Sequence, residues 1–483
     1  MTSPRQALAL RLETLEAHIK AEHPTLLPII PTFRKLDKVL YRMGLLGYDQ
    51  SLATRIPWWP MISVLGTFSA GKSSFINRYL GVALQSTGNQ AVDDKFTVVC
   101  YGADSRYEAL PGTALNADPR FPFFRMSDEI EKVAPGEGKR IDSYLQLKTC
   151  GSERVRGKIL IDSPGFDADD QRRSILRLAD HILDLSDLVL IFFDARRPEP
   201  GAMNDTLHHL VAKSVNRTDA RKFLYILNQI DTTAKEDNPE EVVGAWQRSI
   251  AQAGLISGKF YGIYNKDLAS PFATPAQKER FEAKCDEDLA EIEGRMKEVE
   301  IGRGYRIVGM VETLVNELES EVAPFLKDAV VRWRRRMAVI DGAIFALLGA
   351  AVAGGVWALG LENSALILAM ATETLPRQVG SLSILLAIVG GLHFWAGNLL
   401  AQRMARGLPD RFGQMELDTR AAFLRNTRFI TSVFRALPVG WGSGARRQIF
   451  AIREAAARHV QALNDLYTDP AGRKDGGAGK GAG

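Results

Sequence analysis

Cysteine and net charge are both scarce in this sequence. Only three cysteines occur among its 483 residues, and Cys100, Cys150 and Cys285 are scattered. Their spacing matches no metal-ligand pattern, so the sequence predicts neither a disulfide framework nor a zinc site, as is typical of a reducing compartment. The formal net charge is +4. Such a small charge gives no global basic field for nucleic acid, and we expect no nucleic-acid partner.

The N-terminus lacks the apolar core of a signal peptide, because residues 1–21 are charged and helix-forming. Hydrophobic residues make up 46% and charged residues 24% of the chain, a balance typical of a folded protein. The length leaves room for a globular domain and a second part. We expect the globular domain and both termini to lie in the cytoplasm.

Apolar runs that alternate with helical stretches begin at residue 61. Strands are predicted at 61–65, 96–101, 144–148, 158–161, 188–193 and 223–227. Helices are predicted between several of them, at 72–80, 171–184, 203–215 and 239–253. This alternation indicates an α/β fold, with a mainly parallel sheet and helices on both faces. Outside it, the helical stretches are 5–50, 275–336 and 402–468.

Residues 66–73 read Gly-Thr-Phe-Ser-Ala-Gly-Lys-Ser, the pattern of a phosphate-binding loop. Its glycines let backbone N–H groups curl around phosphates, Lys72 supplies positive charge, and the Ser73 hydroxyl is a ligand for Mg²⁺. The pattern also occurs by chance, but here a predicted strand precedes it and a helix follows, which is the context that it requires. The predicted nucleotide contacts are Gly66, Ser69, Ala70, Gly71, Lys72, Ser73 and Ser74.

A second element follows the predicted strand 158–161, which runs into Asp162-Ser163-Pro164-Gly165. An ordinary strand-to-turn junction suits these residues as well. Their position after the phosphate loop favours Asp162 as the Mg²⁺ ligand, through water, and Gly165 as the backbone that approaches the γ-phosphate. Phe166 comes next, so we expect no water-orienting glutamine of the small-GTPase type.

A third element, Asn228-Gln229-Ile230-Asp231, stands at the end of the predicted strand 223–227. The usual guanine-reading motif is Asn-Lys-x-Asp, in which the Asp accepts hydrogen bonds from the guanine edge. Asn228 and Asp231 match it, whereas Gln229 replaces the lysine whose aliphatic stem packs on the base. The sequence therefore favours GTP and leaves ATP open.

These motifs resemble those of the dynamin superfamily, and within it the EHD (EH-domain-containing) ATPases. The resemblance covers residues 57–324, including Phe-Phe-Asp-Ala-Arg at 192–196. It extends to 111–123, 259–268 and 280–292, which a generic phosphate-loop protein lacks. The family implies a self-assembling mechanochemical protein that remodels membranes and hydrolyses nucleotide slowly until its G domains associate. By this resemblance Ser69 helps to stabilise the transition state, and 111–123 is an assembly loop.

The sequence departs from the family at two places. It ends in helices and a glycine-rich tail where EHD proteins carry an EH module. Residues 91–96, Ala-Val-Asp-Asp-Lys-Phe, lack the threonine pair that precedes Asp-x-Phe in the family. Thr87 would position the attacking water if the loop shifts, so the predicted catalytic residues are Ser69, Lys72 and Thr87. The hydrolysis rate stays open, and so does the base, because dynamins use GTP and EHD proteins use ATP.

Residues 343–361 and 378–402 contain no charged side chain. About 20 helical residues cross a bilayer core of about 30 Å, so both stretches are long enough to span it. Buried core helices are the alternative. The arginines that flank the two stretches are Arg332, Arg334, Arg335 and Arg336 before the first, and Arg403, Arg406 and Arg411 after the second. By the positive-inside rule they predict an integral membrane hairpin with both ends cytoplasmic, and insertion into a single leaflet stays open.

The predicted fold class is therefore α/β, a phosphate-loop GTPase of the dynamin type with a helical bundle and a two-helix transmembrane hairpin. The expected segments are 1–55 (N-terminal bundle helices), 56–275 (G domain), 276–336 (stalk), 337–402 (hairpin), 403–468 (C-terminal bundle helices) and 469–483 (disordered tail). The predicted function is Mg²⁺-dependent hydrolysis of GTP, or ATP, coupled to self-association through G domains and to remodelling of a lipid bilayer by fusion, fission or tubulation. The alternative is a membrane-bound GTPase switch or scaffold that recruits effectors with little mechanical work.

Overall fold

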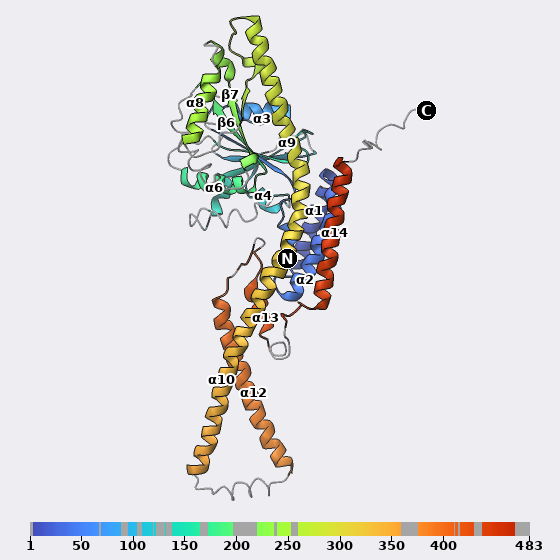
Figure 1. Cartoon of the computed structure of the whole chain (residues 1–483), viewed down its shortest axis with the longest axis vertical. Helices are drawn as coiled ribbons and strands as arrows, with labels where there is room; N and C mark the ends of the chain where they lie inside the picture. Colours follow the sequence, from blue (N-terminus) through green and yellow to red (C-terminus); the bar gives the residue numbers. More distant parts are fainter. Residues whose placement is uncertain are drawn as a thin grey trace, which may run out of the picture. The chain divides into compact units, whose positions relative to one another are not determined.

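The computed structural model describes residues 3–66, 69–87, 95–103, 109–118, 120–121, 131, 138–164, 172–196, 220–235, 239–252, 259–358, 375–409, 411–413, 416–428 and 437–468. The chain divides into two compact units (Figure 1). The sheet unit contains 11–27 and 56–307, and the helical unit contains 1–10, 28–55 and 308–483. Two of their four boundaries fall inside helices α1 (Pro4–Glu22) and α9 (Pro275–Glu317). The finer division into six segments stays a prediction.

An eight-stranded sheet of order β3-β4-β2-β5-β1-β6-β7-β8 forms the centre of the sheet unit. Its strands are β1 (Met61–Gly66), β2 (Phe96–Tyr101), β3 (Ala109–Pro111), β4 (Leu145–Cys150), β5 (Ile159–Asp162), β6 (Leu188–Asp194), β7 (Phe223–Asn228) and β8 (Phe260–Ile263). All neighbouring pairs are parallel except β2 with β5 and β3 with β4. The mainly parallel α/β sheet is confirmed. Strands β3 and β8 were not predicted, because such short segments carry no periodic signal.

Helices α3 (Lys72–Leu80), α6 (Arg172–Leu185) and α8 (Pro239–Gln252) lie around the sheet (Figure 1). Every residue of β1, β6 and β7 is buried, as expected for parallel strands covered on both faces. On one face the rings of Phe193 in β6 and Trp246 in α8 have centroids 4.6 Å apart. Aromatic packing of this kind holds the carboxyl ends of the central strands in place. The predicted helix at 203–215 lies outside the described residues.

The helical unit contains α2 (Ile30–Met43), α10 (Ala323–Ala358), α12 (Leu375–Arg406), α13 (Thr419–Asn426) and α14 (Ser443–Thr468). Although they come from opposite ends of the chain, α2 and α14 lie side by side (Figure 1). Two side-chain contacts join them, Thr32 Oγ1 with His459 Nε2 at 3.2 Å and Arg42 Nη1 donating to Gln448 Oε1 at 3.0 Å. A π-helical turn, Leu318–Val322, separates α9 from α10.

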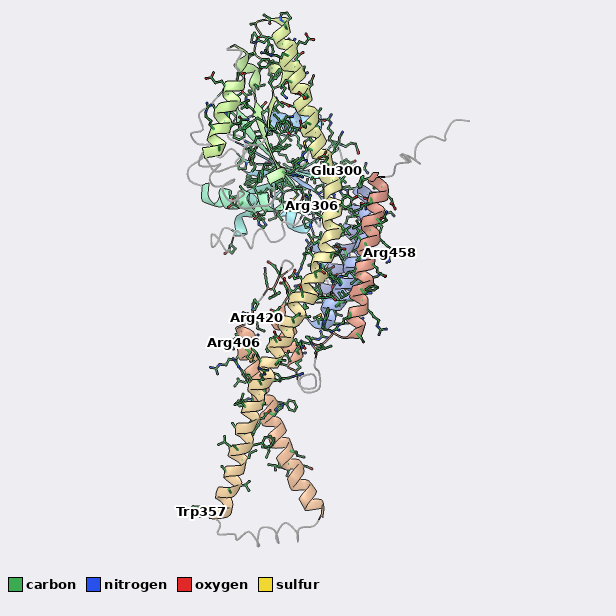
Figure 2. All side chains as sticks on the ribbon, in the orientation of Figure 1. Glu300, Arg306, Trp357, Arg406, Arg420 and Arg458 are labelled. Atoms are coloured by element: carbon green, nitrogen blue, oxygen red, sulfur yellow. The ribbon has the colours of Figure 1, made fainter. Side chains whose placement is uncertain are left out.

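Helices α10 and α12 pair to form a helical hairpin (Figure 1). The indole Nε1 of Trp333 donates to the carbonyl of Gly397 at 3.2 Å, and Asp341 Oδ1 lies 2.8 Å from His393 Nδ1. Among the described helices, two are long and apolar enough to cross a membrane, and only 6% and 11% of their apolar windows are buried. Core helices of a soluble protein are mostly buried, whereas these two windows are mostly exposed. Figure 2 labels Trp357 at the far end of α10, where its side chain is 87% exposed.

Candidate nucleotide-binding site

The phosphate-loop motif begins where the buried strand β1 ends. Gly66, its last residue, has φ 156°. A Cβ at this position would lie 2.6 Å from the carbonyl oxygen of Phe192 in the neighbouring strand β6. Only glycine therefore lets the chain turn here against β6. Thr67 and Phe68 lie outside the described residues, and the loop continues at Ser69.

Ser69 and Gly71 both have left-handed backbone conformations, with φ 58° and 81°. Successive residues that combine left-handed and right-handed backbone form concave groups of N–H donors, which bind anions. A Cβ on Gly71 would lie 2.0 Å from Asn228 Nδ2, so this position requires glycine for space as well as for backbone conformation. A non-glycine residue at positive φ, such as Ser69, is typical of a functional turn.

Lys72 is the first residue of α3, and its side chain lies against the loop that precedes it. The residue is 7% exposed. Its Nζ donates a hydrogen bond to the carbonyl of Gly66 at 2.9 Å. A buried ammonium group needs such acceptors, and phosphate oxygens are stronger acceptors than a neutral carbonyl. The structure therefore places a cation and the amino end of a helix together at this loop.

A polar chain runs from the start of α3 across to β5 and β4. Ser73 Oγ lies 3.4 Å from Asp162 Oδ2, at the limit of a hydrogen bond. Gln85 Nε2 donates to the same carboxylate oxygen at 2.7 Å, and Gln85 Oε1 accepts from Lys148 Nζ at 2.6 Å. Gln85 and Asp162 are 3% and 4% exposed. Gln85 therefore orients the carboxylate, and Lys148 orients Gln85.

The oxygen atoms of Ser73 and Asp162 fit a hard divalent cation. A hydroxyl and a carboxylate are the ligand types that Mg²⁺ accepts, with phosphate and water oxygens completing its coordination. Among the described residues no group of three His, Cys, Asp or Glu could hold a metal ion. A site of this kind would therefore depend on a bound triphosphate for most of its ligands.

The Asn-Gln-Ile-Asp motif contacts the phosphate loop directly. Asn228 Nδ2 donates to the carbonyl of Ala70 at 2.8 Å, and Gln229 Nε2 donates to the carbonyl of Ser69 at 3.0 Å. Gln229 has φ 63°, and its backbone N–H donates to Asn228 Oδ1 at 2.9 Å. The Gln229 side chain thus connects the Asn-Gln-Ile-Asp motif to the phosphate loop.

Asp231 lies one turn further along, in η6 (Ile230–Lys235). It is 5% exposed, and its Oδ2 accepts from the backbone N–H of Ser270 at 2.7 Å. At the end of β6, Arg196 makes a two-pronged ion pair with Asp194 through Nε and Nη2. Hydrogen bonding to Asp194 raises the pKa of Arg196, and the charge of Asp231 adds to this effect. Arg196 therefore remains a cation beside the Asn-Gln-Ile-Asp motif.

The structure brings most of the predicted site residues to one edge of the sheet. Those that it describes there are Gly66, Ser69, Ala70, Gly71, Lys72, Ser73, Ser74, Asp162, Asn228 and Asp231. Thr87 is described as an exposed residue after α3, while Gly165 lies outside the described residues. Sequence reasoning missed Gln85 and Lys148, because neither belongs to a motif with a known spacing. Arg196 was named only as the last residue of the Phe-Phe-Asp-Ala-Arg stretch that resembles the family.

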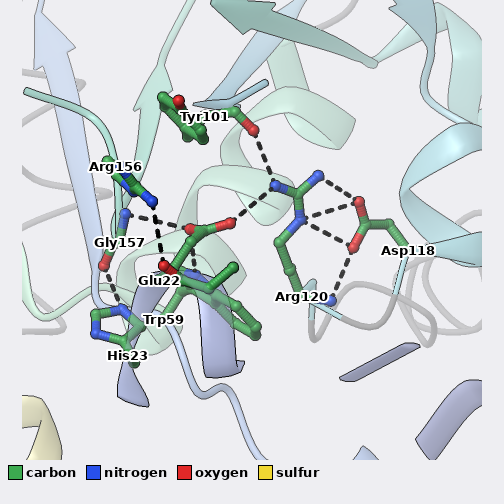
Figure 3. Close-up of polar contacts among 9 residues, drawn as sticks. Glu22, His23, Trp59, Tyr101, Asp118, Arg120, Arg156 and Gly157 are labelled. Atoms are coloured by element: carbon green, nitrogen blue, oxygen red, sulfur yellow. Dashed lines mark hydrogen bonds and ion pairs between the residues drawn. The ribbon is translucent and has the colours of Figure 1, made fainter. Parts of the chain in front are cut away.

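The segment 111–123 carries a second polar cluster, in which Arg120 is the central cation (Figure 3). Arg120 pairs with Asp118 at 2.7 Å and with Glu22 at 3.5 Å, and its Nη1 donates to the carbonyl of Tyr101 at 3.0 Å. The side chains of Arg120 and Glu22 are only 11% and 8% exposed. Burial opposes the charge of Arg120, but the hydrogen bonds to Asp118 raise its pKa. Arg120 therefore stays charged and tied within this unit.

Glu22 links that cluster to the end of helix α1. Its Oε2 accepts from Trp59 Nε1 at 2.8 Å and from the backbone N–H of Gly157 at 3.2 Å (Figure 3). The next residue, His23, places Nε2 at 2.6 Å from the Gly157 carbonyl, and burial lowers the pKa of His23. The C-terminal end of α1 is thus held against the sheet unit by several hydrogen bonds. This is a separate cluster from the phosphate loop.

Comparisons with known proteins agree with this geometry. Residues 62–230 match the sequence profile of the Dynamin family. EH domain-containing protein 1 of Arabidopsis thaliana is 22% identical over 244 residues, covering 48% of this chain and 42% of that relative. The chain therefore spans less than half the length of that relative.

Two solved structures of an oligomerised bacterial dynamin pair, described as sensing and tethering membranes, are also similar. They cover 97% and 96% of this chain and 77% and 76% of theirs, at 14% and 15% identity. Their TM-scores of 0.32 and 0.31 are too low to establish a common arrangement of the whole chain. The family match, by contrast, runs from β1 to just beyond β7 and includes the phosphate loop, Asp162 and Asn228. Residues 62–230 of this chain therefore form a domain of the Dynamin family.

Proposed function

We propose that this protein is a membrane-anchored dynamin-like nucleoside triphosphatase that hydrolyses GTP, with ATP as the other candidate, and remodels membranes as it self-associates. The observation that carries the proposal is the arrangement around one loop at the carboxyl ends of β1, β5 and β7. Lys72, Asp162 and Asn228 come from three different parts of the sequence and meet at that loop or its helix. Ligands of parallel α/β sheets bind at this edge.

In this proposal the phosphate loop holds the triphosphate. The backbone N–H groups around Ser69 and Gly71 donate to the phosphate oxygens, and Lys72 exchanges the Gly66 carbonyl for them. Ser73 and Asp162 would hold Mg²⁺, which when bound would neutralise charge on the outer phosphates. Gln85 keeps the Asp162 carboxylate in position for that role. Lys72 contacts the loop, Ser73 contacts Asp162, and Gln85 contacts Asp162 from the other side.

The catalytic step of the proposal uses three further positions. Ser69 stabilises charge that develops during transfer of the γ-phosphoryl group, Gly165 approaches that phosphate, and Thr87 positions the attacking water. Asn228 and Asp231 read the base, and Asp231 would accept hydrogen bonds from a guanine edge. The pattern Asn-x-x-Asp supports GTP.

The membrane part of the proposal rests on the helical hairpin. Its apolar side chains are exposed along both helices, including Phe345 at 61%, Ile384 at 64% and Trp395 at 67%. A continuous exposed apolar surface of this kind requires a bilayer or a partner. We infer that α10 and α12 anchor the protein, with the G domain and both termini cytoplasmic. Association of G domains in the nucleotide-bound state would then move the bundle and deform the bilayer.

The test uses the full-length protein reconstituted into liposomes. GTP and ATP hydrolysis are measured with and without lipid, and vesicle shape is followed by electron microscopy. We expect lipid-stimulated turnover and nucleotide-dependent oligomers, both lost in Lys72→Ala. Lys297→Ala, which removes an exposed lysine of α9, is the matched control and retains both. A monomer whose turnover ignores lipid would contradict the mechanochemical role.

One sequence feature supports the alternative role of a scaffold with little hydrolysis, namely the missing threonine pair at 91–96. In that case GTP, ATP or both would bind together with Mg²⁺. Nucleotide hydrolysis would be negligible, and the vesicles would keep their shape. Robust turnover that disappears in Lys72→Ala excludes this alternative. Calorimetric titration with GTP and ATP separates the two bases in either case.

A further inference from the structure

Helices α10 and α12 are packed along only part of the hairpin. Near its base, buried residues recur every three or four positions, namely Val330, Trp333 and Met337 in α10 and Gly397, Ala401 and Ala405 in α12. A Cβ on Gly397 would lie 3.5 Å from Trp333 and 3.8 Å from Met337, so the two backbones approach closely there. By contrast, none of the side chains described at 342–358 and 383–392 is buried. The packing therefore ends part-way along the hairpin.

A polar pair stands where the packing ends. Asp341 Oδ1 lies 2.8 Å from His393 Nδ1, and their side chains are 28% and 29% exposed. Asp341 follows Met337 by four positions and His393 precedes Gly397 by four, so each continues the packed face of its helix. Past the pair, a Cβ at Gly390 would meet no neighbouring atom within 4 Å. The two helices separate from there toward the far end of the hairpin (Figure 1).

The same pair marks the edge of the apolar part of the hairpin. Asp341 is the last charged residue of α10, and α12 carries no charge between 378 and 402. Because His393 is level with Asp341, residues 394–402 lie beside the charged part of α10. The length that is uncharged in both helices therefore begins at the pair. An ionisable side chain at such an edge is costly unless it is paired, and it commonly has a function.

Histidine is the side chain whose charge changes between about pH 5 and 8, whereas aspartate stays anionic in that range. With a neutral imidazole the pair carries one net negative charge. Protonation of His393 turns it into a neutral ion pair with a stronger, charge-assisted hydrogen bond. The bond gains further strength from the low dielectric constant at the edge of an apolar layer.

The other charged groups near the pair, among the residues that the structure describes, are arginines. They are Arg334, Arg335 and Arg336 before Asp341 on α10, and Arg403 after His393 on α12. From the side of α13, Leu424, Thr427 and Arg428 line a cavity of about 380 Å³ together with His393 and Trp333, and only Arg428 of those three is charged. Arg425 of α13 donates instead to the carbonyl of Tyr41. The arginines repel a protonated imidazole, so the attraction of His393 depends on Asp341.

We propose that the Asp341–His393 pair is an acid-closed clasp of the hairpin. Protonation of His393 holds α10 and α12 together at the edge of their apolar part, and loss of that proton releases them. The uncompensated carboxylate of Asp341 then favours water over the apolar layer and draws α10 away from α12. The helices would separate from the contact of Trp333 with Gly397 onward, one to two turns earlier. This inference rests on the proposed insertion of the hairpin into a membrane.

The experiment measures how far the hairpin opens in full-length protein reconstituted into phosphatidylcholine liposomes. Val352→Cys and Ile384→Cys place nitroxide labels on the apolar part of each helix, where both native side chains are 64% exposed. The three native cysteines are buried, and protein without the two substitutions supplies the labelling background. Distances are measured by double electron–electron resonance at about pH 5 and about pH 8, the two ends of the histidine range. We expect a short, narrow distribution at the lower pH and a longer, broader one at the higher pH.

Three variants of the doubly labelled protein test the clasp itself. His393→Gln keeps a neutral donor that does not titrate, so the long distribution should occur at both pH values. His393→Lys keeps a cation at both pH values and should give the short distribution at both. Asp341→Asn removes the anion and should abolish the response to pH. His459→Gln is the matched control, because it removes a histidine of α14 that contacts Thr32, and it should respond like the parent.

The outcomes that overturn the clasp are distinct from those that overturn the membrane anchor. A distance that does not change with pH, a change of opposite sign, or a parent-like response in His393→Gln overturns the clasp. Extraction of the protein from membranes by alkaline carbonate tests the anchor. Protein that resists extraction but shows no response dependent on His393 contradicts only this inference, whereas extracted protein contradicts the membrane anchor.

Discussion

The side-chain amide of Gln229 donates a hydrogen bond to the backbone carbonyl of Ser69 at 3.0 Å, across 160 positions of sequence. Ser69 stands in the phosphate loop at positive φ, and Gln229 stands in the Asn-Gln-Ile-Asp motif, also at positive φ. A second bond, from Asn228 to the Ala70 carbonyl, runs in parallel. The two motifs are therefore joined by direct hydrogen bonds, which help to hold the unusual backbone of both.

Gln229→Ala should weaken nucleotide binding without unfolding the protein. The variant loses one neutral hydrogen bond, which contributes about 0.5–1.5 kcal/mol, so we expect Kd to rise about two- to tenfold. Calorimetric titration with GTP and ATP measures the change. Gln461→Ala, on α14, removes an exposed glutamine and is the control. An unchanged Kd in Gln229→Ala would mean that the link between the two loops does not contribute to affinity.

Gly71→Ala should abolish nucleotide binding for two reasons, a clash of the new Cβ atom and an unfavourable backbone conformation. The new Cβ would lie 2.0 Å from Asn228 Nδ2, and the residue would keep φ 81°. We expect an affinity loss greater than about tenfold, measured with a fluorescent nucleotide.

Gly81→Ala is the matched control for that variant. Gly81 also has positive φ, at 71°, but no atom lies within 4 Å of its Cβ position. Alanine there costs about 1–2 kcal/mol of stability from the backbone alone and should leave binding intact. Equal affinity losses in the two variants would show that backbone strain, and not the contact with Asn228, is responsible.

Gln85→Ala should change the Mg²⁺ dependence more than the affinity for free nucleotide. Gln85 donates to Asp162, and a hydrogen bond to a charged group contributes about 1.5–3 kcal/mol. Without it the carboxylate is no longer oriented, and we expect the Mg²⁺ concentration for half-maximal hydrolysis to rise about tenfold or more. Gln146→Ala, in which the lost side chain donates to Thr97 on the same sheet, should leave the Mg²⁺ dependence unchanged. A normal Mg²⁺ response in Gln85→Ala would exclude a positioning role for that residue.

Arg120→Ala should destabilise the sheet unit. The substitution leaves the carboxylates of Glu22 and Asp118 without their cation, and removal of one partner from a buried ion pair costs about 3–5 kcal/mol. Urea unfolding of the full-length protein in detergent, followed by tryptophan fluorescence, measures the loss. Arg156→Ala removes a solvent-exposed arginine from the same cluster and should change little (Figure 3). Comparable stability of the two variants would contradict the central role of Arg120.

The ionisation of Asp37 makes the stability of the helical unit depend on pH. Burial raises the pKa of Asp37 to about 6, although Ser51 and the Leu52 N–H donate to it. Because the folded pKa lies above the unfolded value of 3.8, the folded state binds the extra proton. This contribution to stability is complete below about pH 4 and is lost as the pH rises through about 6.

The side chain at position 37 of the Asp37→Asn variant does not titrate. From pH 4 to pH 7 the free energy of unfolding of the variant should therefore fall by about 2–3 kcal/mol less than that of the parent protein. Urea unfolding at a series of pH values measures the difference between the two proteins. Asp49→Asn, at an exposed position of the following turn, is the control. A difference that stays constant with pH would contradict the raised pKa.

The fold of the sheet unit was largely predictable from the sequence. Six strands and the helix after the phosphate loop were predicted close to their observed bounds, because long apolar runs and the loop motif are signals carried by consecutive residues. The two short strands β3 and β8 carry too few residues for such a signal. The arrangement of Gln85 and Lys148 around Asp162 could not be predicted either, since it depends on β2, β4 and β5 lying next to one another.

The sequence by itself determined that this protein has a phosphate-loop motif, an Asn-Gln-Ile-Asp motif and two uncharged apolar helices. Each of these is a run of neighbouring residues whose chemistry depends on local spacing. Only the tertiary structure decided that Gln229 contacts Ser69, that Gln85 holds Asp162, and that Arg428 lines a cavity with Trp333. Those pairs are distant in sequence, and they meet because strand order and helix packing bring them together, which no local pattern encodes.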